Sequence, residues 1–127
     1  MMNIHHIGYA VSCIEDALEK LTALGFIQES QVYDDKNRNV RILFMSNKVY
    51  KIELVAPLDI AKPSPVDGIL SKKMAGHYYI CYEVDSLKDS VEKFRTEGVL
   101  LLNLPPEREL LNPMWFLFSR RIWVLLN

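Results

Sequence analysis

Two side chains that can bind a metal ion or move a proton stand within apolar stretches of this chain. His6 begins the alternating segment His6–Val11, and Glu53 lies inside the strand-like run near residues 48–56. A carboxylate buried in such surroundings needs a partner, because burying an unpaired charge is costly. A metal ion, Lys51 or His6 could be that partner, and a plain His6–Glu53 hydrogen bond would be a purely structural arrangement.

Alternation along the two strands predicts which face carries these groups, since neighbouring residues of a strand point to opposite sides. The apolar positions expected to pack under a helix are Ile7, Tyr9, Val11, Ile52 and Leu54. His6, Lys51 and Glu53 then share the opposite face. Gly8 and Ala10 lie beside His6 on that face, and their small side chains leave room, so we expect them to line a ligand pocket.

A second copy of the first module follows at an offset of 73 residues. Residues 6–27 align without a gap onto residues 79–100, and the same offset carries the last strand of the first copy onto the end of the chain. The identical pairs are Ile7/Ile80, Tyr9/Tyr82, Val11/Val84, Asp16/Asp89, Glu19/Glu92, Lys20/Lys93 and Gly25/Gly98. A single offset that spans both ends of a module indicates a duplication.

Each copy has the same expected order of elements: a strand, a helix and three further strands. The segment Ser12–Glu15 has a capping-box pattern and predicts the start of the first helix, and Asp85 is the expected cap of the second. Gly25 and Gly98 are the expected ends of the two helices. The strand-like runs after the first helix lie near residues 26–33, 40–46 and 48–56.

The whole chain, residues 1–127, is expected to form a single domain built from two modules. Module one covers about residues 3–56 and module two about residues 77–127. The prolines between them mark a linker over about residues 57–76, with one helical turn. A second proline-rich piece, Leu104–Pro113, interrupts module two and is either a lid loop or an ordinary connection.

Composition and charge exclude several classes of function. The chain has 15 Lys and Arg against 16 Asp and Glu, and a formal net charge of −1, so no nucleic-acid partner is expected. No stretch reaches the roughly 18 apolar residues of a membrane span, and the N-terminus lacks a signal-peptide pattern. Cys13 and Cys81 have no metal-type spacing, so we expect reduced thiols in a cytoplasmic protein.

Three motifs resemble the vicinal oxygen chelate superfamily of glyoxalases, bleomycin resistance proteins and dioxygenases. They are HHIGYAV at His5–Val11, KIELVAP at Lys51–Pro57 and YYICYEVDS at Tyr78–Ser86, and they are most similar to bacterial glyoxalase I and methylmalonyl-CoA epimerase. The resemblance implies an α+β fold, with tandem βαβββ modules whose mixed sheet curves into a cup, usually in a homodimer. It also implies one divalent metal, Ni²⁺, Zn²⁺ or Co²⁺, held by two side chains of each module.

Carried over position by position, the resemblance assigns His6 and Glu53 as the metal ligands of module one and Glu53 as the catalytic carboxylate. The matching positions of module two hold Tyr79 and Leu126, where the family has histidine and glutamate. Two donors are fewer than the three or four of an ordinary zinc or nickel site, so the predicted site is incomplete. Tyr79 and His77 are the candidate further ligands, and His77 would need a bulge that re-aims its strand.

Two hypotheses for function follow. The first is a metal-dependent isomerase or lyase of the glyoxalase I or epimerase kind, acting on a small 2-oxo or thioester-type substrate with the incomplete site of His6 and Glu53. The second is a metal-free protein on the same fold that binds or sequesters a small molecule, in which Tyr79, Cys81 and Leu126 line an apolar pocket. The retained ligands His6 and Glu53 favour the first hypothesis, and the replacement of the other two ligands by Tyr79 and Leu126 favours the second. The sequence is therefore compatible with an enzyme and with a binding protein.

Overall fold

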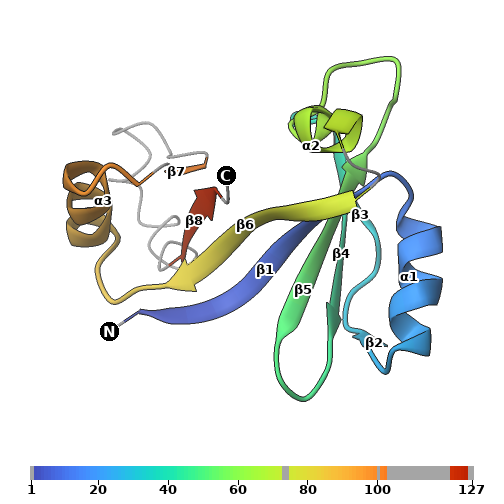
Figure 1. Cartoon of the computed structure of the whole chain (residues 1–127), viewed down its shortest axis with the longest axis horizontal. Coiled ribbons are helices and arrows are strands. Elements are labelled where there is room, and N and C mark those ends of the chain that lie inside the picture. Colours follow the sequence, from blue (N-terminus) through green and yellow to red (C-terminus); the bar gives the residue numbers. More distant parts are fainter. Residues whose placement is uncertain (1, 73–74, 100, 103–120, 126–127) are drawn as a thin grey trace. The chain divides into compact units, whose positions relative to one another are not determined.

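The computed structural model describes residues 2–72, 75–99, 101–102 and 121–125. In chain order, its elements are β1 (Asn3–Val11), α1 (Ile14–Ala23), β2 (Ile27–Gln28), β3 (Tyr33–Asp35), β4 (Val40–Ser46), β5 (Lys51–Pro57), α2 (Asp67–Lys72), β6 (Ala75–Glu83), α3 (Leu87–Thr96), β7 (Leu101–Leu102) and β8 (Arg121–Leu125) (Figure 1). The strands pair mainly antiparallel and occur together with helices, so the fold class is α+β, as the sequence predicts. No helix in the described part of the chain is long and apolar enough to cross a membrane.

The chain divides into two compact units. The larger unit consists of residues 6–78, and the smaller unit consists of residues 1–5 and 79–127. In the smaller unit, β6 pairs antiparallel with β8, and β8 pairs antiparallel with β7. The buried residues of its core are Val84, Val91, Phe94 and Ile122. The predicted lid or connection at Leu104–Pro113 lies outside the described residues.

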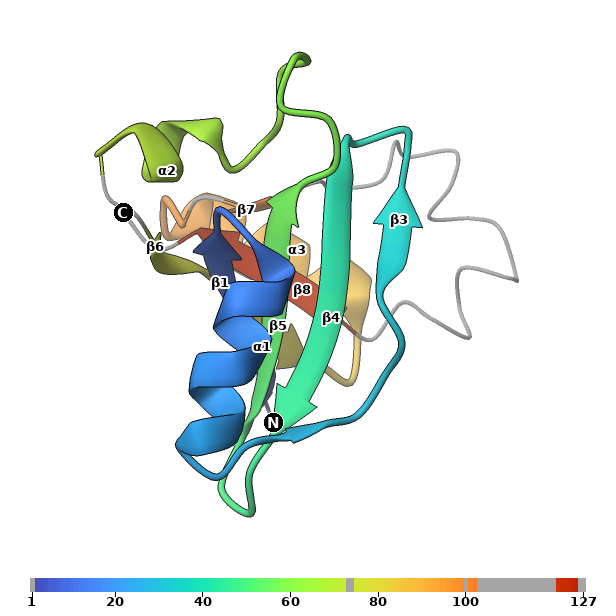
Figure 2. The ribbon, with the colours of Figure 1, turned by 90° about the vertical axis from the view of Figure 1, so that its right-hand side faces the viewer.

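The strands of the larger unit form a mixed sheet around β5. This strand pairs in parallel with β1 and antiparallel with β4, and β4 pairs in turn with the short strands β2 and β3 (Figure 2). The register sets Gly8, Glu53 and Phe44 in one row across three strands. The central place of β5 is consistent with its apolar residues Ile52, Leu54, Val55 and Ala56, all of which are buried.

The run predicted as one strand near residues 26–33 is instead two short strands, β2 and β3. Between them, Ser30 Oγ accepts a hydrogen bond from Phe44 N at 3.0 Å, and Ser30 O accepts one from Gln28 Nε2 at 2.8 Å. A side chain that takes a backbone partner in this way replaces a ladder bond and interrupts regular pairing. The strand predicted at residues 40–46 is confirmed as β4.

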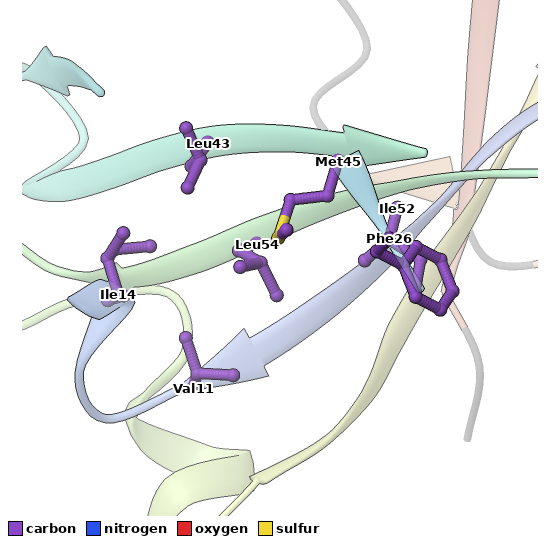
Figure 3. Packing of buried hydrophobic residues seen from close by; sticks show 8 residues of the cluster. Val11, Ile14, Phe26, Leu43, Met45, Ile52 and Leu54 are labelled. Carbon is purple, nitrogen blue, oxygen red and sulfur yellow. The ribbon is translucent and has the colours of Figure 1, made fainter. Parts of the chain in front are cut away.

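The core of the larger unit lies between α1 and one face of this sheet, and Figure 3 shows the buried side chains over the strands. Its buried members are Val11, Ile14, Phe26, Leu43, Met45, Ile52, Leu54 and Ala56. Leu43, Met45 and Leu54 are completely buried, and each such side chain contributes about 1.5–3 kcal/mol when it leaves water. The predicted alternation is confirmed for Val11, Ile52 and Leu54, which all belong to this core.

The helices α1 and α3 end at equivalent positions of the two copies. Each is followed by a glycine with positive φ, Gly25 at 93° and Gly98 at 74°. The next residue in each case, Phe26 or Val99, donates its backbone N–H to a carbonyl of the last helical turn. This is the hydrogen-bond pattern of a Schellman motif, in which glycine avoids the steric cost of the left-handed region. Both glycines therefore end their helices, as the sequence predicts.

The helix starts differ from the predicted ones. The N-cap of α1 is Cys13, whose side chain makes no capping bond, and Glu15 accepts from Cys13 Sγ at 3.4 Å instead of completing a capping box. The cap of α3 is Ser86 rather than Asp85, because Ser86 Oγ accepts a hydrogen bond from Asp89 N at 3.3 Å. The two caps, at 13 and 86, keep the offset of the duplication.

The Ser86→Ala variant is expected to lose about 1 kcal/mol of the free energy of unfolding, because an N–H of the first turn of α3 loses its acceptor. The reverse change at the equivalent position, Cys13→Ser, is expected to add a few tenths of a kcal/mol or more. Urea unfolding followed by far-ultraviolet circular dichroism measures both changes. Equal stabilities of Ser86→Ala and the wild type would show that the cap bond contributes nothing.

Asn39 fastens the start of the predicted linker to the turn between β3 and β4. Its φ of 56° lies in the left-handed region, and the residue is 9% exposed. Its Nδ2 lies 3.0, 3.1 and 3.0 Å from the carbonyl oxygens of Asp59, Lys62 and Pro63. Its Oδ1 accepts a hydrogen bond from Asp59 N at 2.9 Å, and its carbonyl accepts one from Leu58 N. One side chain thus organises the segment that leaves β5.

The same turn contains an acid-sensitive ion pair. Arg38 Nε donates to Asp35 Oδ2 at 2.7 Å, and Arg38 N donates to Asp35 Oδ1 at 3.0 Å. Partial burial is the largest single influence and would raise the pKa of Asp35, but the bonds and the charge of Arg38 together outweigh it. The pKa of Asp35 therefore lies below its ordinary value.

This shift predicts a pH-dependent contribution to stability. A carboxyl group with a lowered pKa in the folded state stabilises above its unfolded pKa of about 3.9, and it loses that effect as the pH falls through the folded value. The Arg38→Gln variant is expected to be less stable by about 0.5 kcal/mol at pH 7, with a smaller difference at pH 2.5. Urea unfolding at both pH values tests this, with Lys36→Gln in the same turn as the charge-matched control.

Candidate functional site

A group of polar side chains of the larger unit lies on the sheet face turned away from α1. They are presented by β1, β4 and β5, and the residues of this face include His6, Gly8, Phe44, Ser46, Lys51 and Glu53. The parallel register places Gly8 directly beside Glu53. Because glycine has no side chain, it leaves Glu53 room above β1 in the direction of His6.

His6 and Glu53 are brought together. His6 Nε2 lies 2.7 Å from Glu53 Oε2, and the two residues are 1% and 7% exposed. The distance between the two atoms is that of a hydrogen bond, but the angles at the atoms are not those of one. The contact is an ion pair when the imidazole is protonated. Of the three partners considered for Glu53, the structure therefore places His6 against it.

Phe44 orients the imidazole of His6. The two ring centroids are 5.3 Å apart and the ring planes are perpendicular, a geometry that contributes about 0.5–1.5 kcal/mol. The sequence analysis missed Phe44. Asn47 could have located it, because an asparagine there predicts the turn between β4 and β5. Its Oδ1 accepts hydrogen bonds from the N–H groups of Val49 and Tyr50 in that turn. Register counted outward from this turn pairs Phe44 with Glu53.

Lys51 forms its ion pair with Glu29, whereas Glu53 contacts His6. Its Nζ lies 3.1 Å from Glu29 Oε2 and 5.9 Å from the centroid of the Phe44 ring. Ser46 Oγ donates to Glu29 Oε1 at 2.5 Å. The side chains of Lys51 and Glu29 are 34% and 37% exposed, so this pair is open to solvent while His6 and Glu53 are buried. Sequence reasoning did not single out Glu29, which follows β2 and reaches the face only through the fold.

His77 packs against an aromatic ring of β1. Its ring centroid lies 5.1 Å from that of Tyr9, and Tyr9 packs against the core under α1. The predicted role of His77 as a further ligand stays a prediction. Gly8 and Ala10 are both buried beside His6, and their role in lining a pocket stays a prediction.

The module-two positions belong to the smaller unit. Tyr79 and Cys81 lie on β6, opposite Leu125 and Trp123 of β8, and are 3% and 0% exposed. The predicted roles of Tyr79 as a ligand or pocket wall and of Cys81 as a pocket wall stay predictions. Leu126 lies outside the described residues.

The amino-acid sequence of the chain is similar to those of known proteins. A sequence profile for the family described as Glyoxalase/Bleomycin resistance protein/Dioxygenase superfamily matches residues 5–114. Among curated proteins, the chain is 28% identical over 100 residues to the ethylmalonyl-CoA/methylmalonyl-CoA epimerase of Cereibacter sphaeroides. The match covers 78% of this chain and 73% of that relative.

Solved structures share the fold. A hypothetical protein from Bacillus halodurans matches with a TM-score of 0.69 and 28% identity, over 84% of this chain and 78% of that chain. A methylmalonyl-CoA epimerase from Mycobacterium tuberculosis matches with a TM-score of 0.64 and 25% identity, over 79% of this chain and 67% of that chain. The sequence comparison and the structure comparison thus both include methylmalonyl-CoA epimerases.

Proposed function

This chain belongs to the Glyoxalase/Bleomycin resistance protein/Dioxygenase superfamily, and from that premise we propose that it is an isomerase of a small acyl thioester. The reaction is the removal and return of a proton at the carbon next to the thioester carbonyl. The observation that carries the proposal is the buried contact between His6 and Glu53. The relatives named as epimerases of methylmalonyl-CoA and ethylmalonyl-CoA support a thioester as the substrate class.

Glu53 is the proposed base. A carboxylate within hydrogen-bond reach of an α-proton can take it, and the electron pair of the C–H bond then moves onto the thioester oxygen. His6, 2.7 Å from the carboxylate, holds Glu53 in place and, when protonated, stabilises the enolate oxygen. A proton that solvent delivers to the opposite face of the carbon inverts its configuration, and a proton that Glu53 returns to the first face leaves only isotope exchange.

Of the four family positions, only two hold donors that suit the divalent metal that the resemblance implies. Imidazole nitrogen and carboxylate oxygen are donors that Zn²⁺, Ni²⁺ and Co²⁺ accept, and His6 and Glu53 supply one of each. The other two family positions hold the phenol of Tyr79 and the apolar Leu126. Two well-suited donors are fewer than the three or four of a resident site, so the steps above use the side chains of the chain alone.

Proton exchange measured in D₂O tests the proposal. Chelator-treated protein is incubated with methylmalonyl-CoA, and loss of the α-proton signal is followed by NMR, with the rate in buffer subtracted. We expect exchange that is proportional to protein concentration. A parallel series with added Zn²⁺, Ni²⁺ or Co²⁺ measures whether a metal contributes. Absence of exchange in every one of these series would overturn the proposal.

A metal-free binding protein is the second candidate, and one observation favours it. Tyr79, at the position where the family has a ligating histidine, is 3% exposed, as expected of a side chain used for packing. A thioester that binds with a measurable Kd but shows no α-proton exchange would support this second function. In either case we propose a homodimer, which the family resemblance implies, and a cytoplasmic location, which the reduced thiols expected at Cys13 and Cys81 support.

A further inference from the structure

Lys51 is the neighbour of the proposed base along one face of β5. Lys51 and Glu53 are two residues apart on β5 and therefore share a face. Such residues lie about 6.5–7 Å apart along a strand. A small ligand can contact both side chains through two of its atoms, each about 3 Å from one side chain. The two atoms must then belong to neighbouring groups of the ligand. A carboxylate attached to the reacting carbon meets this requirement.

The surroundings of Lys51 suit an exchangeable anion. An ammonium group has three N–H donors, and within the described part of the chain Lys51 has one carboxylate partner, Glu29, at 3.1 Å. Both side chains are about one-third exposed, so an anion from solvent can reach the ammonium group. The ammonium nitrogen also lies over the ring of Phe44, 5.9 Å from its centroid, which adds a cation–π contact.

Glu29 has a second partner, Ser46, which stays bound to it when Lys51 binds another anion. Ser46 Oγ donates to Glu29 Oε1, while Lys51 approaches the other oxygen, Oε2. The backbone of Glu29 is also held, because its N–H donates to Phe44 O at 2.9 Å. The pair can therefore open by a movement of Lys51 alone, and Glu29 keeps a hydrogen bond on the protein.

We infer that Lys51 is a specificity-determining residue that binds the carboxylate of an α-carboxy acyl thioester, and that Glu29 competes with that carboxylate. The inference rests on the proposed function, since the thioester is its substrate class. Lys51 holds the carboxylate while the α-carbon faces Glu53. Acyl thioesters without a carboxylate lack this contact and leave Lys51 paired with Glu29.

A matched pair of ligands tests the inference by binding alone. Malonyl-N-acetylcysteamine and acetyl-N-acetylcysteamine differ by one carboxylate, and isothermal titration of the chelator-treated full chain gives a Kd for each. We expect the malonyl ligand to bind at least about tenfold more tightly, as a charge-assisted hydrogen bond allows. This preference is expected to fall as the NaCl concentration rises, because the pair is exposed.

Two variants are expected to change the preference in opposite directions. Lys51→Met is expected to remove it, and Lys51→Arg is expected to keep most of it. Glu29→Gln is expected to strengthen malonyl binding about threefold or more, because the competing charge is gone. Lys48→Met, which removes an exposed lysine of the neighbouring turn, is the matched control and is expected to bind both ligands as the wild type does.

The outcomes separate this inference from the proposed function. A wild-type chain that binds both ligands equally, or a Lys51→Met variant that keeps the preference, overturns the role of Lys51. Either result leaves α-proton exchange by Glu53 intact. Selective malonyl binding that depends on Lys51, without any α-proton exchange, supports the carboxylate site and overturns the isomerase instead.

Discussion

The Glu53→Gln variant is expected to exchange the α-proton of methylmalonyl-CoA about 10³-fold more slowly than the wild-type chain. Glutamine keeps the size of the side chain and can still contact His6, which lies 2.7 Å from the carboxylate. Its neutral amide is not a base, so it cannot take the proton. The measurement is the exchange rate by NMR in D₂O at saturating substrate, together with a thermal melt to show that the variant is folded.

The matched control for this prediction is Glu19→Gln. Glu19 lies on the exposed side of α1, so the same substitution removes the same charge far from the proposed chemistry. It is expected to leave the exchange rate unchanged. A folded Glu53→Gln variant that keeps a rate within about threefold of the wild type would assign the proton transfer to another group. In that case, the His6–Glu53 contact would be purely structural.

The Asn39→Ala variant is expected to lose about 3 kcal/mol or more of the free energy of unfolding. It removes contacts with three carbonyl groups and one backbone N–H of the segment after β5, and each such bond contributes about 0.5–1.5 kcal/mol net. Alanine is also poorly suited to a φ of 56°, which adds about 1–2 kcal/mol. Urea unfolding measures the total.

Two further variants separate the contributions at this position. Asn39→Gly loses the side-chain bonds but accepts positive φ, so it is expected to be about 1 kcal/mol more stable than Asn39→Ala. Asn37→Ala, in the same turn and exposed, is expected to change stability by less than about 0.5 kcal/mol. Equal losses for Asn37→Ala and Asn39→Ala would show that the buried amide does not hold this segment.

The effects of the two main substitutions are expected to be distinct. Asn39 precedes β4 at the end where Val40 pairs with Pro57, whereas Glu53 pairs with Phe44 further along the same ladder. The hydrogen bonds between β4 and β5 hold the register of Glu53 independently of the turn. Below its melting temperature, Asn39→Ala is therefore expected to keep the α-proton exchange that Glu53→Gln loses.

Local features of this chain were determined by the sequence itself. The ends of α1 and α3 at Gly25 and Gly98 follow from the free access of glycine to positive φ. The face of Ile52 and Leu54 follows from the two-residue period of a strand. These predictions need only neighbouring residues, which is why they hold. The helix caps were one residue off or lacked their bond, since caps depend on side-chain geometry that a pattern only suggests.

Contacts between distant residues were decided only by the tertiary structure. The sequence placed His6 and Glu53 on one face, but three partners for Glu53 were equally compatible with it. The parallel pairing of β1 with β5 brought His6 to the carboxylate, and the segment after β2 brought Glu29 to Lys51. Strand order and register join residues far apart in the chain, and they result from packing the strands of the larger unit against α1. No local pattern carries that information.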